Sequence, residues 1–219
     1  MIRHTLAPVV PSAARALDIR RTLPRETEEV AITFDDGPHP EGTPAILELL
    51  AKEHVHATFF MVGEQVERRP ALAAEVASEG HVIGLHCHRH RLQLRLSRAA
   101  IHDDLERGRA AITDATATDP QLHRAPYGIY SATGLTALRA TRMAPLLWSR
   151  WGKDWRKFTT PQRIFNRVTR GLTPGDVILL HDADFYSAKG SHRNTAGALE
   201  LILAELKQRE LGTTIPPPG

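Results

Sequence analysis

Short apolar runs alternate with segments of helical periodicity along most of the chain. The runs are rich in β-branched and aromatic residues, which favours strands, and they cover residues 29–34, 57–63, 81–87, 144–151 and 176–182. The intervening segments predict helices over residues 43–54, 64–80, 96–116, 131–143, 160–172 and 195–211. Strands that are apolar on both faces are typical of parallel sheets covered by helices. The alternation therefore predicts an α/β fold, either a barrel or a doubly wound sheet.

Length and composition indicate a single domain. With 219 residues, 42% hydrophobic and 24% charged, the chain can bury one sizeable core. We expect that domain over residues 27–219, preceded by an irregular arm over residues 1–26 and ending in a short strand or loop. The arm has prolines and arginines where a signal peptide needs an unbroken apolar region, and no later run is long enough for a membrane span. The sequence as given predicts a soluble chain, and a leader removed upstream is compatible with it.

The charged residues predict no nucleic-acid site. The net charge is +3, and the lysines and arginines alternate with acids in the helical segments instead of forming one block. This pattern is typical of a solvated surface that tolerates anionic polymers. The single cysteine, Cys87, excludes an internal disulfide.

Unusual polar residues lie where the predicted strands end. Asp35 and Asp36 end the first strand, His86 ends the third, Asp154 follows the fourth and His181 ends the fifth. Because the carboxyl ends of parallel strands meet at one edge of a sheet, this edge is the expected position of the functional site.

Histidines suggest a metal site at this edge. His86 and His90 are four residues apart, so they share one face of a helical turn; in a strand His86, His88 and His90 would share a face. Two histidines and one carboxylate leave coordination positions open on a metal such as Zn²⁺, which suits the activation of water. The spacing alone is also compatible with a solvated loop.

The adjacent carboxylates Asp35 and Asp36 are hard to explain by structure. Like charges side by side repel, but the pair is useful if one carboxylate binds a metal and the other accepts a proton from the metal-bound water. The alternative is an Asx-type turn in which Asp36 caps the backbone before Gly37 and Pro38. That turn would account for one aspartate and not for both.

Five short blocks extend this pattern into a family resemblance. The blocks TFDDGPHP, GHVIGLHCHRH, HRAPYG, GKDW and GDVILLHD, in this order, resemble the signature blocks of the polysaccharide deacetylases. The resemblance, to the NodB-homology domain of carbohydrate esterase family 4, covers about residues 28–212. It implies a distorted (β/α) barrel and metal-dependent removal of N- or O-acetyl groups from a sugar polymer. Substrates in that family include chitin and its oligomers, peptidoglycan and acetylated xylan.

The resemblance assigns roles to the residues at the sheet edge. It implies that Asp35 is the catalytic base, that His181 is the general acid, and that Asp36, His86 and His90 bind the metal. The expected cofactor is one divalent ion, Zn²⁺ first, with Co²⁺, Ni²⁺ and Mn²⁺ as alternatives. The expected partner is an acetylated glycan, and no protein partner is implied.

Supporting roles follow from the same blocks. Arg124 is expected beside the carboxylate site, the backbone N–H of Tyr127 in the oxyanion hole, and Asp154 as the residue that orients the general acid. Cys87 and His88, between the two ligand histidines, are expected to be a small packed residue and a loop residue.

Substrate contacts are expected from Trp151, Trp155, Leu179 and Pro126. Trp155 would pack against the general acid and Leu179 would contact the acetyl methyl. Trp151 replaces an aspartate that many family members have three residues before the acid-orienting position, and we place it in either the substrate groove or the core. Trp148 is expected in the core. The segment after His181, residues 182–195, would border the substrate or form a solvated loop.

The favoured function is N-deacetylation of chitooligosaccharides or peptidoglycan. One alternative is a catalytically inactive protein on the same fold that binds metal or glycan, which the tryptophan at position 151 makes conceivable. Another is a deacetylase of O-acetyl esters such as acetyl xylan. The resemblance implies a secreted or wall-associated protein if a leader was removed, and a cytoplasmic one otherwise.

Overall fold

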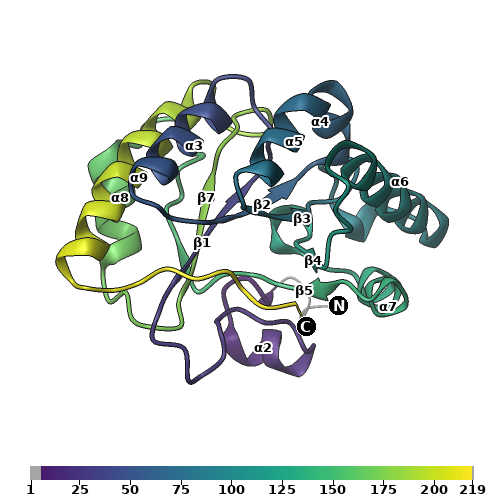
Figure 1. Ribbon diagram of the computed structural model, residues 1–219. Helices are drawn as coiled ribbons and strands as arrows, with labels where there is room; N and C mark the ends of the chain where they lie inside the picture. Colours follow the sequence, from purple (N-terminus) through teal and green to yellow (C-terminus); the bar gives the residue numbers. More distant parts are fainter. Residues whose placement is uncertain (1–5, 219) are drawn as a thin grey trace.

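The computed structural model describes residues 6–218. These residues form a seven-stranded sheet in the order β5-β4-β3-β2-β1-β7-β6, with every neighbouring pair parallel. The strands are β1 (Ala31–Asp35), β2 (Thr58–Met61), β3 (Val82–Leu85), β4 (Leu122–His123), β5 (Ala144–Pro145), β6 (Arg150–Trp151) and β7 (Val177–His181). Strands β5 and β6 are the two edge strands, and within the described chain they do not pair with each other. The curled sheet is therefore an open half-barrel (Figure 1). Of the two predicted architectures, the distorted (β/α) barrel is confirmed.

Helices cover the outside of the sheet. They are α2 (Pro11–Ala16), α3 (Gly42–Lys52), α4 (Gly63–Arg68), α5 (Pro70–Ser78), α6 (Arg98–Thr116), α7 (Ala132–Thr141), α8 (Pro161–Thr169) and α9 (Ser191–Gln208), with short 3-10 turns at Gln93–Arg95 and Pro126–Gly128. Helices α3, α8 and α9 lie over one half of the sheet, and α4, α5 and α6 over the other (Figure 1). Ser97, Ser131 and Thr160 each accept a backbone N–H of the helix that follows, which caps its first turn.

Some predicted boundaries were wrong for local reasons. The helix expected over residues 64–80 breaks at Arg69, because Pro70 has no N–H and disfavours helical backbone in the residue before it. The strand expected over residues 144–151 divides into β5 and β6. Strand β4 was not predicted, since only two residues pair there and they carry no apolar run.

The N-terminal arm is more ordered than predicted. Residues 11–16 form α2, and Ala7, Ala14, Ile19 and Leu23 are buried in the main core. The backbone N–H of Leu23 also donates to the carbonyl of Gly175 at 2.9 Å. The prediction of an irregular arm is therefore wrong for residues 11–16, because apolar side chains spaced along the arm pack against the barrel; residues 1–5 lie outside the described part.

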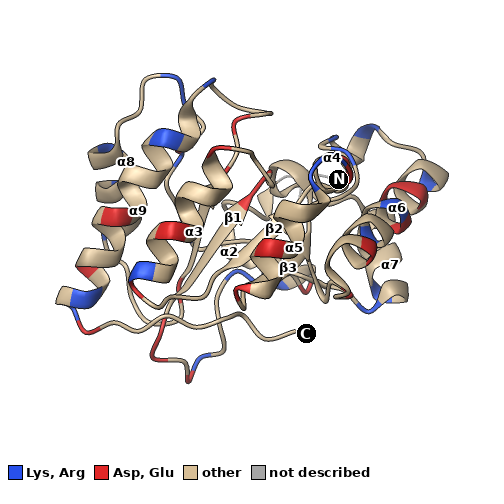
Figure 2. Cartoon of the chain, turned by 45° about the horizontal axis from the view of Figure 1, so that its top comes forward, with Lys and Arg blue, Asp and Glu red and all other residues tan. Residues whose placement is uncertain are grey.

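Basic residues are less evenly mixed with acids than the sequence pattern suggested. Figure 2 shows α8 with basic positions and no acidic ones, whereas α6 and α9 carry both. The prediction of scattered basic residues is thus wrong for α8. None of the helices within residues 6–218 combines the length and the apolar character that crossing a bilayer requires.

Candidate active site

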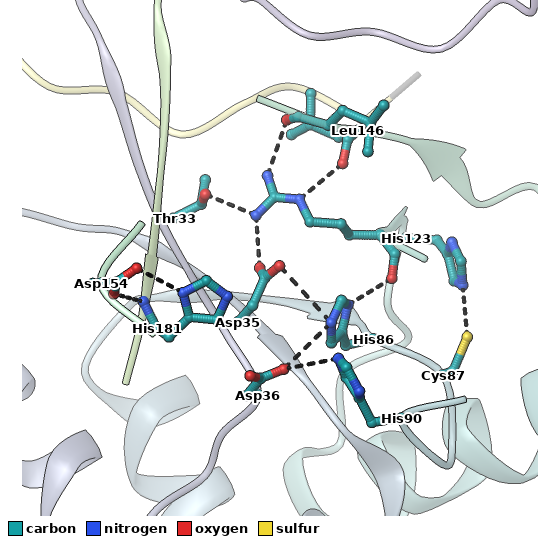
Figure 3. A network of polar contacts seen from close by, with 12 residues as sticks. Thr33, Asp35, Asp36, His86, Cys87, His90, His123, Leu146, Asp154 and His181 are labelled. Atoms are coloured by element: carbon teal, nitrogen blue, oxygen red, sulfur yellow. Dashed lines mark hydrogen bonds and ion pairs between the residues drawn. The ribbon is translucent and has the colours of Figure 1, made fainter. Parts of the chain in front are cut away.

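The register of the strands brings the predicted polar residues together. Asp35 at the end of β1 lies opposite His181 at the end of β7, and Leu85 at the end of β3 lies opposite His123 on β4. The residues that follow these positions therefore meet at the carboxyl edge of the sheet, as Figure 3 shows. This is the edge that the sequence predicted.

Asp36, His86 and His90 form a cluster that fits a cation. Asp36 Oδ1 lies 3.5 Å from His86 Nε2 and 3.4 Å from His90 Nε2, and these ligand atoms converge within 4.8 Å of one another. His86 Nδ1 contacts the carbonyl oxygen of Arg124 at 2.7 Å. Because a carbonyl only accepts, Nδ1 carries a proton, and Nε2 is the ring nitrogen that faces Asp36. Asp36 Oδ1 is buried and has no hydrogen-bond partner within residues 6–218, so a bound cation would complete the cluster.

The charge state of this cluster suits metal binding. Burial alone would raise the pKa of Asp36, but the contact with His86 and the charges of His181 and His90 hold this pKa at about 2. Burial lowers the pKa of His90 to about 4, against the opposing charge of Asp36. At neutral pH the cluster thus offers an ionised carboxylate and a neutral imidazole, the forms that bind a divalent ion.

The backbone explains how adjacent aspartates reach one site. Successive residues of a strand point to opposite faces, so Asp35 and Asp36 would diverge if β1 continued. Instead Asp36 has a φ of 81°, in the left-handed region that non-glycine residues seldom adopt. Both carboxylates therefore lie beside His86, with the nearer oxygen of Asp35 at 3.8 Å from His86 Nε2.

Asp35 is held by a fully buried arginine. Arg124 Nη1 donates to Asp35 Oδ1 at 2.7 Å and to the Thr33 hydroxyl at 2.9 Å. Its Nε and Nη2 donate to the carbonyls of Leu146 and Leu147, both at 3.0 Å. Four of the five N–H bonds of the guanidinium thus have acceptors within residues 6–218, and one of these acceptors is a carboxylate.

His181 and Asp154 form a second pair across the site. Asp154 Oδ1 lies 2.9 Å from His181 Nδ1, and its Oδ2 accepts the His181 backbone N–H at 2.7 Å and the Thr195 hydroxyl at 2.8 Å. Burial alone would lower the pKa of His181, but Asp154, with Asp36 and Asp35, raises it to about 10. The imidazole is therefore protonated at neutral pH, as a proton donor must be.

A cavity of about 270 Å³ at the sheet edge is lined by Asp35, Asp36, His86, His90 and His181. Its walls include the predicted substrate contacts Trp151, Trp155 and Leu179. Tyr127 lies at the rim with 57% of its surface exposed and a φ of 61°. Pro126 is buried and does not belong to the described lining residues, so a direct substrate contact is not favoured for it. Trp148 lies in the core, as predicted, and its buried ring also reaches the cavity wall.

Tyr186 has a place in the site that the sequence left open. Its ring stacks on His90 with centroids 4.3 Å apart and planes inclined by 10°. Its hydroxyl donates to Glu64 Oε1 at 2.8 Å, which fixes the ring. The only sequence signal was that Tyr186 lies in the segment after His181, which borders the cavity together with Ser187.

Two of the residues between His86 and His90, Cys87 and His88, are packed, whereas Arg89 is exposed. Cys87 is buried with its sulfur 3.4 Å from His123 Nε2, and burial raises the pKa of the thiol. His88 is buried too, and it lies outside the cluster of Asp36, His86 and His90. The small packed role expected for Cys87 agrees with its burial, whereas the loop position expected for His88 underestimated how deeply it is packed.

A second group of ligand-type residues, His39, Asp184 and His192, lies nearby. His39 Nδ1 accepts the backbone N–H of Gly42 at 2.9 Å, at the start of α3. Its Nε2 therefore carries the proton and faces Asp184 Oδ1 at 3.2 Å. A donor N–H cannot bind a metal, so this group ties the segment after β7 to α3 instead.

Comparison with known proteins agrees with this geometry. A family model described as polysaccharide deacetylase matches residues 23–146. The chain is 35% identical over 190 residues to a peptidoglycan-N-acetylglucosamine deacetylase of Bacillus cereus, with 85% of either chain covered. It is 36% identical over 157 residues to a chitooligosaccharide deacetylase of Bradyrhizobium, with 71% of either chain covered.

Solved structures show the same fold. A crystal structure of a peptidoglycan N-acetylglucosamine deacetylase superposes with a TM-score of 0.85 at 30% identity, covering 93% of this chain and 92% of that one. A carbohydrate esterase family 4 pseudoenzyme of Bacillus anthracis gives a TM-score of 0.79 at 25% identity, covering 88% of this chain and 65% of that one. Fold alone thus does not separate active from inactive members, but the sequence matches establish that the chain belongs to the polysaccharide deacetylase family.

Proposed function

We propose that this protein is a metal-dependent N-deacetylase of acetylated glycans, chitooligosaccharide or peptidoglycan. The observation that carries the proposal is the unpartnered oxygen of Asp36 facing two imidazole nitrogens, between a buried Asp35–Arg124 pair and a His181–Asp154 pair. This arrangement provides a cation site, a base and an acid around one cavity.

Asp36, His86 and His90 would hold the divalent ion, with Zn²⁺ the expected metal for a carboxylate and two imidazoles. When bound, the ion supplies Lewis acidity that polarises the acetyl carbonyl and makes water a stronger nucleophile. Tyr186 stacked on His90 and the Arg124 carbonyl on His86 would orient the two imidazoles.

Asp35 would accept the proton of the attacking water. Arg124 occupies Asp35 Oδ1, which leaves Oδ2 as the free oxygen beside the cation cluster. The ion pair with Arg124 fixes the direction of the carboxylate. The backbone N–H of Tyr127 at the cavity rim would donate to the oxyanion that forms when the carbonyl is attacked.

His181 would protonate the leaving nitrogen of the sugar. Asp154 accepts from Nδ1 and so leaves Nε2 as the proton donor toward the cavity. A protonated imidazole is most useful for an amide, since an amine anion leaves much less readily than an alkoxide. This requirement favours an N-acetyl substrate over an O-acetyl ester.

The cavity would hold the acetyl group and one sugar. Leu179 supplies an apolar wall for the methyl group, while Trp151 and Trp155 offer ring faces to a pyranose. Because base, acid, acid-orienting aspartate and cation cluster all lie at this one cavity, we favour an active enzyme over a glycan-binding pseudoenzyme.

A panel of acetylated glycans tests the proposal. Acetate release is measured from N-acetylated chitooligosaccharides, peptidoglycan fragments and acetylated xylan. We expect release from at least one N-acetylated glycan and a lower rate on xylan esters. Release confined to xylan would overturn the amide preference, and glycan binding without any release would support the pseudoenzyme alternative.

A further inference from the structure

A second hollow adjoins the candidate active site. It encloses about 870 Å³ between β6, residues 153–159 and one face of α8. Trp151 lines both this groove and the active-site cavity. A chain of sugars whose acetylated unit occupies the cavity can therefore extend past this side chain into the groove.

The groove is lined by cations. Its basic side chains are Arg150, Lys153, Arg156, Lys157, Arg163, Arg167 and Arg170, and no acidic residue of the described chain lines it. Arg150 pairs with Asp176 at 2.8 Å. Within residues 6–218 the other six form no ion pair with a carboxylate, whereas some exposed arginines elsewhere do, as Arg109 does with Asp119 at 2.6 Å.

Helix α8 holds two of these arginines, Arg163 and Arg167, and a third, Arg170, follows its last residue. Ile164 and Val168 are fully buried against the core, so the opposite face points to solvent. Arg163, Arg167 and Arg170 lie on that outer side, spaced four and three residues apart, and are exposed. Like charges at this spacing repel one another, although Arg167 in the last turn also interacts favourably with the helix dipole. Figure 2 shows basic and no acidic residues along α8.

Lys153 connects the groove to the active site. Its backbone is in the left-handed region, with a φ of 52°, and its ammonium lies 4.4 Å from the centre of the Trp151 ring. Burial lowers the pKa of Lys153, and the charges of Arg156 and Arg167 lower it further. An anion bound among these three side chains would relieve their mutual repulsion.

We infer that this groove binds the anionic part of a glycan substrate, carboxylate groups carried a few units away from the sugar that is deacetylated. The inference rests on the proposed function, because the groove can affect the rate of deacetylation only if the protein is a deacetylase. Arginine forks bind carboxylates and phosphates alike, so a phosphorylated glycan shares the chemistry. Carboxylates are favoured because they occur on the peptide-bearing glycan that several relatives act on by name. Continuity with a sugar-sized cavity favours a glycan over a nucleic acid.

The test compares charged and neutral forms of one substrate. The probes are a peptidoglycan fragment with free side-peptide carboxylates, the same fragment with those carboxylates amidated, and a neutral N-acetylated chitooligosaccharide. The variant is Arg163→Glu with Arg167→Glu. The matched control is Arg98→Glu with Arg139→Glu, two exposed arginines on α6 and α7 with no described ion pair, which changes the net charge equally.

The readout is the ratio of kcat/KM on the carboxylate fragment to kcat/KM on the neutral oligomer. We expect this ratio to fall about tenfold in the groove variant, and to stay at the wild-type value in the control. For the wild-type protein, replacing the carboxylate fragment by its amidated form should lower this ratio by a similar factor. Added salt should also lower the ratio. An equal ratio in wild type and groove variant, or an equal fall in the control, would overturn the inference.

Direct binding separates this inference from the proposed function. If the wild-type protein releases no acetate from any probe, the proposed function fails. The affinities for the carboxylate and amidated fragments then still show whether the groove binds carboxylates. Preference for the carboxylate form, lost in Arg163→Glu/Arg167→Glu, supports it. Tighter binding to a sugar-phosphorylated fragment would assign phosphate as the anion and overturn the carboxylate assignment. Tighter binding to single-stranded DNA than to either fragment would overturn a glycan ligand.

Discussion

Arg124 contacts His86 and Asp35 at the same time. Its backbone carbonyl lies 2.7 Å from His86 Nδ1, and its guanidinium donates to Asp35 Oδ1 at 2.7 Å. One buried residue thus orients a proposed metal ligand through its main chain and the proposed base through its side chain. The positions of the His86 ring and the Asp35 carboxylate therefore both depend on Arg124.

These two contacts can be separated by a substitution that changes only the side chain of Arg124. Arg124→Met keeps the carbonyl on His86 but leaves the buried Asp35 carboxylate without its partner. We expect the free energy of unfolding to fall by about 3–5 kcal/mol, since an unpaired buried charge remains. Chemical denaturation measures this, and Arg139→Met, on an exposed site of α7, is the control. An unchanged unfolding free energy would contradict the buried ion pair.

The cation cluster predicts which histidines bind metal. His86→Ala and His90→Ala should each lose most of about one divalent ion per chain, because only two ligands would remain. His88→Ala is the matched control, since His88 is buried in the same segment but outside the cluster. Elemental analysis of the purified proteins measures the ion. Full occupancy in both ligand variants, or loss only in His88→Ala, would remove these residues from the site.

The adjacent aspartates should separate into two phenotypes. Asp35→Asn should keep the metal and lose the base, whereas Asp36→Asn should weaken metal binding itself. Either change should lower kcat by at least about 10²-fold. Metal content and acetate release measured on the same samples distinguish them. A near-normal rate in Asp35→Asn would refute its role as base.

The acid pair predicts a shift in the pH–rate profile with a definite sign. His181 must be protonated to act, so activity is lost as pH rises through its pKa. Asp154 is the main group that raises this pKa to about 10. In Asp154→Asn the pKa falls, and the high-pH limb of kcat should move to lower pH while metal content is retained. A limb that stays in place, or moves to higher pH, would contradict the assignment.

The sequence predicted where the candidate site residues lie better than it predicted the secondary structure around them. Asp35 and His181 end buried strands and His86 directly follows one, so parallel pairing alone places them at one edge of the sheet. Hydrophobic periodicity cannot show the φ of 81° that turns Asp36 toward the same site. Nor can it show a two-residue strand such as β4, whose register positions Arg124 beside His86.

Features made by distant segments were the hardest to predict. Tyr186 stacks on His90 because the segment after β7 is tied to α3 through His39 and Asp184, contacts that no local pattern shows. The basic groove did have a sequence signal, since residues 153–170 contain six lysines and arginines and a single acid, Asp154. That acid is buried and points to His181, so the exposed charged residues of this segment are all basic.

Acetate release before and after metal removal tests the central claim most directly. The protein is treated with a chelator, dialysed, and assayed on N-acetylated chitooligosaccharides and peptidoglycan fragments with and without added Zn²⁺. Far-ultraviolet circular dichroism confirms that the metal-free protein remains folded. The account predicts that the release of acetate stops in the folded, metal-free protein and returns with about one equivalent of Zn²⁺ per chain. Acetate release that continues undiminished in the metal-free protein would contradict it.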